Sequence, residues 1–486
     1  MLKRKIQDDL MEWKRTGSKP LVVRGQRQVG KTFILKHFAE DNFKTCIYAD
    51  LSADSDFAKI FTSDDRSNVD SMIFYMGLLR GIKTLDPADT VIFLDEIQDC
   101  PEAFSSLKTF AEDGRYKVIA SGSMIGVTDF INPNPGKKPP LSPMGYTKDL
   151  TMYSMDFEEF LWACGIPQEI IDQVRTHIAD LSPIEEPVFG VFSKLFRTYQ
   201  IVGGMPASVR AYVEDRSTYA NCFAELEEIL IQYRRDITKY CTKKGALKTS
   251  ECFSAIPAQL AENNKRFHYS RISSESVENR NSRRAADRYM ENLLWIKDAG
   301  YGNFCYAVSQ ISSPLEGQVR RDVFKVYLSD TGLLVRMYGE KAAIAVFSSD
   351  SAYNLGAVTE NAVAEALMKC GYSPRYYANN NGKNRMEIDF VLEFFEGLVA
   401  VEVKSGRSRN APSLGKVADC FPVKRRIMFE NGNIRTDNDG IQHLPLFTAA
   451  FINVLDPKPE MFRRPQNNAD GHEEQPDKTP RSKSAR

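Results

Sequence analysis

Short apolar runs and longer amphipathic stretches alternate along residues 1–165. The apolar runs predict strands, and the stretches with apolar residues three or four positions apart predict helices. The predicted strands span residues 20–24, 45–51, 90–95, 116–121 and 149–155. Strands that alternate with helices are typical of a parallel α/β sheet, which is the fold class we expect here.

The pattern changes after residue 156. Helical periodicity dominates up to residue 240, residues 241–340 predict helices followed by a short β-hairpin, and residues 354–455 predict a helix, strand, strand, helix order. Residues 131–145 are rich in Pro, Gly and Lys and predict an irregular loop. The polar, Pro-containing end of the chain predicts disorder.

The first predicted strand runs directly into the sequence GQRQVGKT at residues 25–32, and a helical stretch follows. Its glycines let backbone N–H groups face phosphate oxygens, and the helix adds its positive N-terminal end. Lys31 is expected to reach the β- and γ-phosphates of ATP, and the Thr32 hydroxyl to ligate Mg²⁺. The alternative, a Gly-rich turn without a ligand, does not explain the order of strand, motif and helix. The predicted nucleotide-binding residues are Gly25, Gln26, Arg27, Gln28, Val29, Gly30, Lys31, Thr32 and Phe33.

A second motif, TVIFLDE at residues 90–96, is an apolar strand that ends in two acids. Asp95 at the strand tip is expected to hold Mg²⁺, and Glu96 to orient and deprotonate the attacking water. A strand ending in Asp-Glu is common by itself. Following a phosphate-binding loop, however, the adjacent pair indicates a hydrolytic ATPase.

The strand at residues 116–121 places two small hydroxyls near the same edge of the sheet. Ser121 and Ser123 are both candidates to hold the lytic water or the γ-phosphate. For either residue alone, an ordinary strand-end turn explains the serine equally well.

Composition limits the partners of this 486-residue chain. Lys plus Arg and Asp plus Glu number 64 each, so contact with nucleic acid would require a local basic patch. The nine cysteines include no C-x-x-C pair, which argues against zinc and disulfides and favours a reducing compartment. With no signal pattern and no run of about 18 apolar residues, we expect a cytoplasmic protein without a membrane partner.

Residues 386–405, MEIDFVLEFFEGLVAVEVKS, predict an apolar hairpin. Strand alternation puts Glu402 and Lys404 on one face, and a turn between Phe395 and Glu396 would place Asp389 opposite Glu402. Two carboxylates beside a lysine can form a Mg²⁺ site, and Glu360 at the predicted start of the preceding helix could add a third. The neighbouring Glu387, Glu393 and Glu396 could equally be solvated hairpin charges.

Basic residues concentrate between residues 265 and 288, next to a predicted helix at 282–299. Such a patch can contact DNA phosphates, or it can be a solvated face of a packing unit; the sequence favours neither. The basic residues are Lys265, Arg266, Arg271, Arg280, Arg283, Arg284 and Arg288.

These motifs, together with VIASGS at 118–123 and MDFEEFL at 155–161, resemble a family of prokaryotic AAA-type ATPases. That family joins a P-loop core to a winged helix and a domain similar to PD-(D/E)XK nucleases. The resemblance implies an ATPase core at 1–165, a helical lid at 166–240, a winged helix at 241–340 and a smaller α/β nuclease-like domain at 341–455. A disordered tail would follow at 456–486. The paired glycines at 203–204 match the family's lid and would permit close packing.

The chain departs from the family after Gly145. A basic residue usually follows this glycine, but here Tyr146 does, with Lys148 two positions further on. In a homo-oligomer, the residue that contacts the γ-phosphate from a neighbouring subunit is therefore unassigned. Arg27, Arg234 and Arg235 are substitutes by residue type, and each could equally be a surface ion-pair residue.

Two functions fit these observations. The first is an enzyme that hydrolyses ATP with Mg²⁺ and couples this to DNA binding or processing through its C-terminal domains. The second is a nucleotide-dependent switch whose nuclease-like domain binds a partner without cleaving it.

Overall fold

The computed structural model describes residues 2–63, 67–83, 85–123, 143, 145–241, 243–262, 265–272, 282–350, 352–379, 385–406 and 411–462. The loop predicted at 131–145 lies almost wholly outside these residues, and so does most of the predicted tail. The described chain ends in a short helix, η8 (Glu460–Phe462).

The N-terminal part is built on five parallel strands in the order β2-β3-β4-β1-β5. The parallel α/β sheet predicted from the sequence is confirmed. β4 lies between β1, which precedes the Gly-rich loop, and β3, which carries the two acids. The strands are β1 (Leu21–Arg24), β2 (Thr45–Asp50), β3 (Thr90–Asp95), β4 (Lys117–Gly122) and β5 (Lys148–Thr151).

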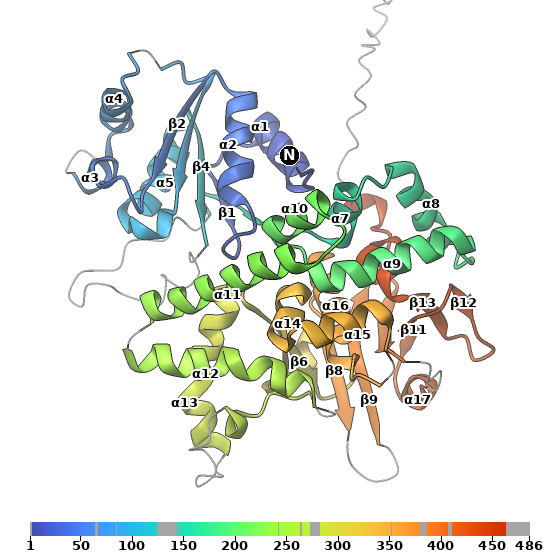
Figure 1. Ribbon diagram of the computed structural model, residues 1–486. Coiled ribbons are helices and arrows are strands. Elements are labelled where there is room, and N and C mark those ends of the chain that lie inside the picture. The colour runs from blue at the N-terminus through green and yellow to red at the C-terminus, as the bar shows by residue number, and fades with distance from the viewer. Residues whose placement is uncertain are drawn as a thin grey trace, which may run out of the picture.

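Helices cover both faces of this sheet (Figure 1). On one face lie α1 (Ile6–Thr16) and α2 (Lys31–Asn42), and on the other α3 (Ser55–Thr62), α4 (Val69–Arg80) and α5 (Pro101–Asp113). β3 is buried at every position because it is covered on both faces, which explains its unbroken apolar run.

β5 is shorter than the strand predicted at 149–155. It pairs only with β1, over residues 148–151, and therefore forms an edge of the sheet. The chain then leaves the sheet to pass over the Gly-rich loop, where the Met152 N–H donates to Arg24 O at 2.7 Å.

A helical region follows, as the periodicity predicts. In α7, Asp156 and Glu159 form a capping box. The chain turns between α9 and α10 at Gly203 and Gly204, and a Cβ at Gly204 would lie 2.0 Å from Met155 O, so the expected close packing is confirmed. The helices are α7 (Phe157–Ala163), α8 (Gln168–Ala179), α9 (Glu186–Val202), α10 (Pro206–Glu214), α11 (Ala220–Tyr240), α12 (Lys243–Leu260) and α13 (Ser282–Asp298).

The C-terminal part contains a mixed sheet of eight strands in the order β12-β13-β11-β10-β9-β8-β6-β7. The hairpin expected as a wing, β6 and β7, forms one edge of this sheet because β6 pairs with β8 in parallel. The winged-helix and nuclease-like assignments stay predictions. The strands are β6 (Gly302–Val308), β7 (Val319–Leu328), β8 (Arg375–Asn379), β9 (Met386–Phe394), β10 (Gly397–Val403), β11 (Val423–Glu430), β12 (Arg435–Thr436) and β13 (Gln442–Pro445).

Helices also flank the second sheet (Figure 1). Asp330 caps α14, because its side chain accepts a hydrogen bond from the Leu333 N–H. α16 begins at Gly356, not at Glu360 as predicted, because residues 357–359 are already buried against the core. The helices are α14 (Thr331–Tyr338), α15 (Glu340–Ser348), α16 (Gly356–Lys369), α17 (Pro412–Cys420) and η7 (Leu446–Leu455).

The register of β9 and β10 agrees with the predicted hairpin. Gly397 pairs with Phe394 and Val401 with Phe390, so the next pair along the strands is Glu402 opposite Asp389. Within the described ranges, no helix combines the length and apolar character needed to cross a membrane.

Candidate functional site

The Gly-rich loop between β1 and α2 has the backbone conformation that its glycines were expected to permit. Gly25 has a φ of 154°, and a Cβ there would lie 2.1 Å from Met152 O, so no larger residue fits. Gly30 has a φ of 91° and immediately precedes α2. The loop therefore ends at a helix N-terminus, where free N–H groups can bind an anion.

Lys31 folds back over this loop. Its ammonium group donates to Gly25 O at 2.8 Å and to Gln26 O at 2.9 Å. Burial lowers the pKa of Lys31 to about 8, against the opposite influence of Glu96 and Asp95. A phosphate that replaced the two neutral carbonyls as the partner of Lys31 would bring a full negative charge next to the buried ammonium.

Asp95 is buried at the end of β3 and accepts hydrogen bonds from three hydroxyl groups. Thr32 Oγ1 donates to Asp95 Oδ2 at 2.7 Å, Tyr48 donates to the same oxygen at 3.3 Å, and Ser121 donates to Oδ1. Ser121 reaches Asp95 because β4 lies beside β3. A hydroxyl and a carboxylate in direct contact fit the oxygen ligands that Mg²⁺ prefers.

Glu96 follows Asp95 in the left-handed backbone region, with a φ of 48°. This conformation is costly for a residue with a Cβ, and it turns Glu96 away from the strand direction. Its carboxylate accepts from Gln98 Nε2, and Ser123 Oγ lies 3.5 Å from the same oxygen. The structure thus separates the two serines, since Ser121 bonds to Asp95 and Ser123 approaches Glu96.

A cavity of about 940 Å³ opens beside the loop, between α2 and α10. The predicted residues Arg27, Gln28, Gly30, Lys31, Thr32, Phe33, Glu96 and Ser123 line it. Gly25 and Gln26 instead line a separate cavity of about 600 Å³, and Val29 and Ser121 are buried.

Among the lining residues that the sequence did not indicate are Trp162 from α7 and Arg210 from α10. Lys3 also lines the cavity, and its ammonium lies 4.3 Å from the Trp162 ring centroid. Arg210 lies four positions after Pro206 at the start of α10, and its side chain is 65% exposed. The family-like glycine turn before α10 was the only signal that this helix would approach the site.

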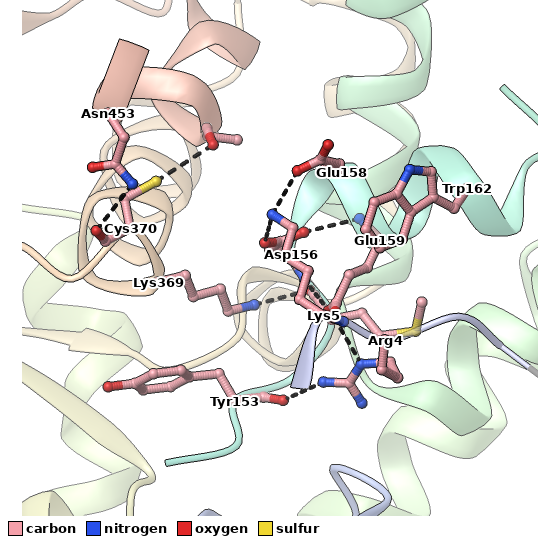
Figure 2. Close-up of polar contacts among 12 residues, drawn as sticks. Arg4, Lys5, Tyr153, Asp156, Glu158, Glu159, Trp162, Lys369, Cys370 and Asn453 are labelled. Atoms are coloured by element: carbon pink, nitrogen blue, oxygen red, sulfur yellow. Dashed lines mark hydrogen bonds and ion pairs between the residues drawn. The ribbon is translucent and has the colours of Figure 1, made fainter. Parts of the chain in front are cut away.

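Charged side chains hold the N-terminal segment beside this cavity (Figure 2). Arg4 donates to Val29 O at 2.9 Å and to Tyr153 O at 2.8 Å, and its guanidinium pairs with Glu159 at 3.1 Å. Lys5 pairs with Asp156 and with Glu158. These contacts fix the loop, α7 and the N-terminal segment as one frame around the cavity.

The three arginines proposed as substitutes lie in different places. Arg27 lines the cavity and pairs with Asp236 of α11 at 2.8 Å. Arg234 and Arg235 are exposed on α11, and Arg234 lies 3.8 Å from Glu227. Within one chain, Arg27 alone of these three lies at the cavity.

The loop also contacts elements outside the first sheet. Gln28 donates to Gln232 of α11 at 2.7 Å. Ser329, which follows β7, donates to Gln26 Oε1 at 2.6 Å. The Gly-rich loop is therefore bonded directly to a helix of the middle region and to the edge of the second sheet.

The second predicted site lies where α16 packs against the second sheet, around Glu360. Its Oε1 accepts from Lys325 Nζ at 3.1 Å and from the Tyr327 hydroxyl at 2.5 Å, and its Oε2 pairs with Lys265. Burial opposes ionisation of this carboxyl, but Lys265 and Lys325 outweigh burial and lower the pKa of Glu360 to about 2. Sequence reasoning missed Lys325, which is buried on β7 and carries no motif.

Asp389 and Glu402 lie next to this ion-pair cluster. Lys325 Nζ is 4.0 Å from Asp389 Oδ1, and Lys404 donates to Glu402 Oε1 at 2.6 Å. Burial and the charge of Glu360 raise the pKa of Asp389, and burial and Asp389 raise the pKa of Glu402 to about 8. Glu402 Oε2 is buried without a hydrogen-bond partner among the described residues.

The structure thus brings the four predicted residues together but adds two lysines to them. Among the residues described, no three His, Cys, Asp or Glu side chains form a group that could hold a metal ion. Both oxygens of Glu360 already have cationic partners. The metal-binding role of Glu360, Asp389 and Glu402 stays a prediction.

The predicted basic patch is partly neutralised. Lys265 pairs with Glu360, Arg271 pairs with Glu262, and Arg288 is exposed at the surface of α13. Arg280 and the side chains of Arg283 and Arg284 lie outside the described residues. DNA binding by this patch stays a prediction.

Comparison with protein families gives a match for the first region. Residues 17–161 match the family profile described as an AAA domain. This match supports an AAA-type ATPase core and nucleotide binding in the first third of the chain. Two further profiles, both domains of unknown function, match residues 193–343 (DUF8612) and 355–448 (DUF4143).

Solved structures with a similar arrangement include the Walker-type ATPase PABY2304 of Pyrococcus abyssi. It is 13% identical over 70% of this chain and 96% of that chain, with a TM-score of 0.40. AMPPCP-bound DnaA from Aquifex aeolicus is 12% identical over 60% of this chain and 86% of that chain, with a TM-score of 0.25. No curated protein sequence matches the chain.

Proposed function

We propose that this chain binds ATP with Mg²⁺ and hydrolyses it at the cavity beside the Gly-rich loop. The observation that carries this proposal is that Lys31, Thr32 and Glu96 line one cavity. Asp95 lies directly behind them and is bonded to Thr32. The AAA-domain match over residues 17–161 supports the same function independently.

Each group at the site has a separate task in this proposal. The loop N–H groups and the N-terminus of α2 bind the phosphates, and Lys31 exchanges its two carbonyl partners for phosphate oxygens. Thr32 and Asp95 would hold Mg²⁺, which when bound supplies positive charge against the phosphates.

Glu96 acts as the general base. It takes a proton from water while the water oxygen forms a bond to the γ-phosphorus and the bond to ADP breaks. Ser123, 3.5 Å from the Glu96 carboxylate, helps to orient it. The left-handed backbone at Glu96 aims the side chain at the cavity, which gives a reason for the strain.

The nucleotide state would be transmitted through the loop's own contacts. Gln28 and Arg27 bond to α11, and Gln26 bonds to Ser329 at the edge of the second sheet. A loop that closes on phosphates would have to change these bonds. We therefore propose that ATP binding and hydrolysis alter the packing of the C-terminal part on the core.

For the C-terminal part, the ion pairs around Glu360 favour a binding role without cleavage over a nuclease. A metal-dependent nuclease needs carboxylate oxygens that are free to bind the ion, and Lys265 and Lys325 occupy those of Glu360. The wild-type protein is expected to leave DNA and RNA intact in Mg²⁺ or Mn²⁺ with ATP. Cleavage that Glu402→Ala abolishes would establish the nuclease alternative.

The experiment for the ATPase proposal compares Lys31→Ala with Lys36→Ala by titration with a fluorescent ATP analogue. Lys36 lies on the same helix outside the cavity and serves as the matched control. Loss of charge-assisted hydrogen bonds from Lys31 should weaken binding by about 100-fold. Tight ATP binding by Lys31→Ala would overturn the assignment of the site.

A further inference from the structure

An open groove of about 960 Å³ lies between the first half of α11 and α15, and it shares no lining residue with the cavity beside the Gly-rich loop. Its apolar floor is made by Tyr219, Phe223, Ala343, Ile344 and Phe347. We name it the α11–α15 groove.

The groove exposes more apolar surface than folding requires. Ile344 and Phe347 are 67% and 50% exposed, although they are three positions apart on one face of α15. The ring centroids of Phe347 and Tyr219 lie 6.1 Å apart in an edge-on contact, and this packing holds the Phe347 ring in place. Two adjacent, ordered and exposed apolar side chains in a concave site are typical of a binding surface.

The rim of the groove is acidic. Glu225, Glu227, Glu228 and Glu340 line it, together with a single cation, Arg336. Arg336 is already bonded to Glu227 at 3.1 Å. Glu225, Glu228 and Glu340 have no ion pair within the described part of the chain. The groove therefore presents unbalanced negative charge around an apolar floor.

We propose that the α11–α15 groove binds an amphipathic helical segment of a partner protein, with apolar residues on one face and lysines or arginines beside them. The apolar face would cover Ile344 and Phe347, and the cations would pair with the three unpaired carboxylates. Helices are recognised in this way when an apolar stripe enters a groove of complementary charge.

The position of the groove also ties it to the ATP site. Glu228 lies at the groove, and Gln232 and Asp236 follow at successive four-residue steps on the same face of α11. Gln232 bonds to Gln28 and Asp236 to Arg27, both in the Gly-rich loop. One helix face thus connects the rim of the groove to the loop, so binding at the two sites is coupled.

The test uses a fluorescently labelled synthetic peptide of about four helical turns, with leucines at positions i, i+3, i+4 and i+7 and lysines elsewhere. A second peptide carries glutamates in place of the lysines. Binding to the full chain is followed by fluorescence anisotropy. We expect the lysine peptide to bind at least about 10-fold more tightly than the glutamate peptide. The affinity of the lysine peptide should fall as the salt concentration increases.

Two double variants show whether the groove is the site. Ile344→Ser with Phe347→Ser should weaken binding of the lysine peptide at least about 10-fold. Phe74→Ser with Leu78→Ser is the matched control, because both residues are 65% exposed, on α4 of the first sheet. The control should bind as the wild type does. All four positions are exposed, so both proteins are expected to fold, and circular dichroism checks this.

Several results would overturn the proposal. These are equal binding of the two peptides, equal loss in both double variants, and no loss in the groove variant. A wild-type oligomer that the groove variant converts to a monomer would assign the groove to a second copy of the chain instead. For the coupling, peptide affinity should change at least about threefold with saturating ADP, and unchanged affinity would refute it.

Discussion

The two sites predicted from the sequence each place a lysine near carboxylates, and they differ in how the charges are compensated. At the Gly-rich loop, Lys31 bonds to neutral carbonyls and lines a large cavity, while Asp95 bonds to neutral hydroxyls. In the second sheet, Lys325 and Lys265 bond directly to Glu360. The first cluster keeps its charges available for a ligand, whereas the second neutralises itself.

This difference separates sites with similar residue types. A buried charge without a charged partner is costly, and a ligand of opposite charge can recover that cost. The pKa of Lys31 is lowered to about 8, and the pKa of Glu360 is lowered to about 2. The first group is destabilised in its charged form and the second is stabilised, so only the first gains from a new counter-ion.

The largest effect is expected from Glu96→Gln. Removal of the proposed general base should lower kcat for ATP hydrolysis by about 10²- to 10⁴-fold, while ATP affinity stays within a few fold. Phosphate release under saturating ATP measures this, with Glu102→Gln in the first turn of α5 as the control. Unchanged turnover would show that another group activates the water.

The next effect tests the self-neutralised cluster. Lys325→Met should destabilise the protein by about 3 kcal/mol, because it leaves the buried Glu360 with a single cation. Chemical denaturation measures the change in the free energy of unfolding. The exposed Lys424, on β11 of the same sheet, gives the control Lys424→Met.

A second substitution makes the Lys325 result specific. Adding Glu360→Gln to Lys325→Met should recover part of the lost stability, since the uncompensated charge is then removed. A double variant as unstable as the sum of the single variants would mean that Lys325 acts through packing alone.

Ligand addition compares the two clusters directly. At about 100 times the dissociation constant, ATP with Mg²⁺ should stabilise the wild type by about 2.7 kcal/mol through binding linkage. Lys31→Ala should lose this stabilisation. Mg²⁺ without ATP should leave the thermal unfolding of Lys31→Ala unchanged, whereas an increase in its Tm that Glu402→Ala abolishes would reveal a metal site at the second sheet.

Another buried carboxylate, Asp330, should give the smallest effect. Burial and the charge of Glu365 raise its pKa to about 6, so the folded state holds a proton that the unfolded state releases near pH 4. Stability should therefore fall as pH rises from about 4 to about 6, by about 2 kcal/mol.

Asp330→Asn removes this titration. The Gly204 and Leu333 N–H groups each donate a hydrogen bond to a different oxygen of Asp330. An asparagine has only one side-chain oxygen, so the variant loses one of these bonds and is less stable than the wild type. The stability deficit should nevertheless shrink as pH rises through the same interval, as followed by denaturation at several pH values. A deficit that is constant or grows with pH would contradict the raised pKa.

Much of the first region could be predicted from the sequence because its chemistry is local. The Gly-rich loop needs particular residues at fixed spacing. In the run at 90–96, the apolar residues indicate a buried strand and the two acids at its end indicate a charged site. The structure places Thr32 against Asp95 as those motifs imply. Trp162 and Arg210 escaped prediction because they reach the cavity through folding of distant helices.

In the second region, the sequence predicted the position of the carboxylates but not the lysine that neutralises them. The hairpin register could be deduced from alternation, and Asp389 does lie opposite Glu402. The spacing of residues in the hairpin could not show Lys325. This lysine comes from β7, which is separated from β9 by β8 and β6 in the sheet. Sequence motifs record which carboxylates gather, but the cation that neutralises them can arrive from any strand.

The pairing of β6 with β8 also determines where the chain can be divided. A fragment that begins at residue 341 would lack β6 and β7, leaving one edge of β8 without a partner strand and Glu360 without Lys325. Unpaired sheet edges promote aggregation, and such a fragment would carry one. Fragments for expression, and the cleavage sites of limited proteolysis, should therefore be sought before residue 302, since the strands on both sides of residue 341 fold as one unit.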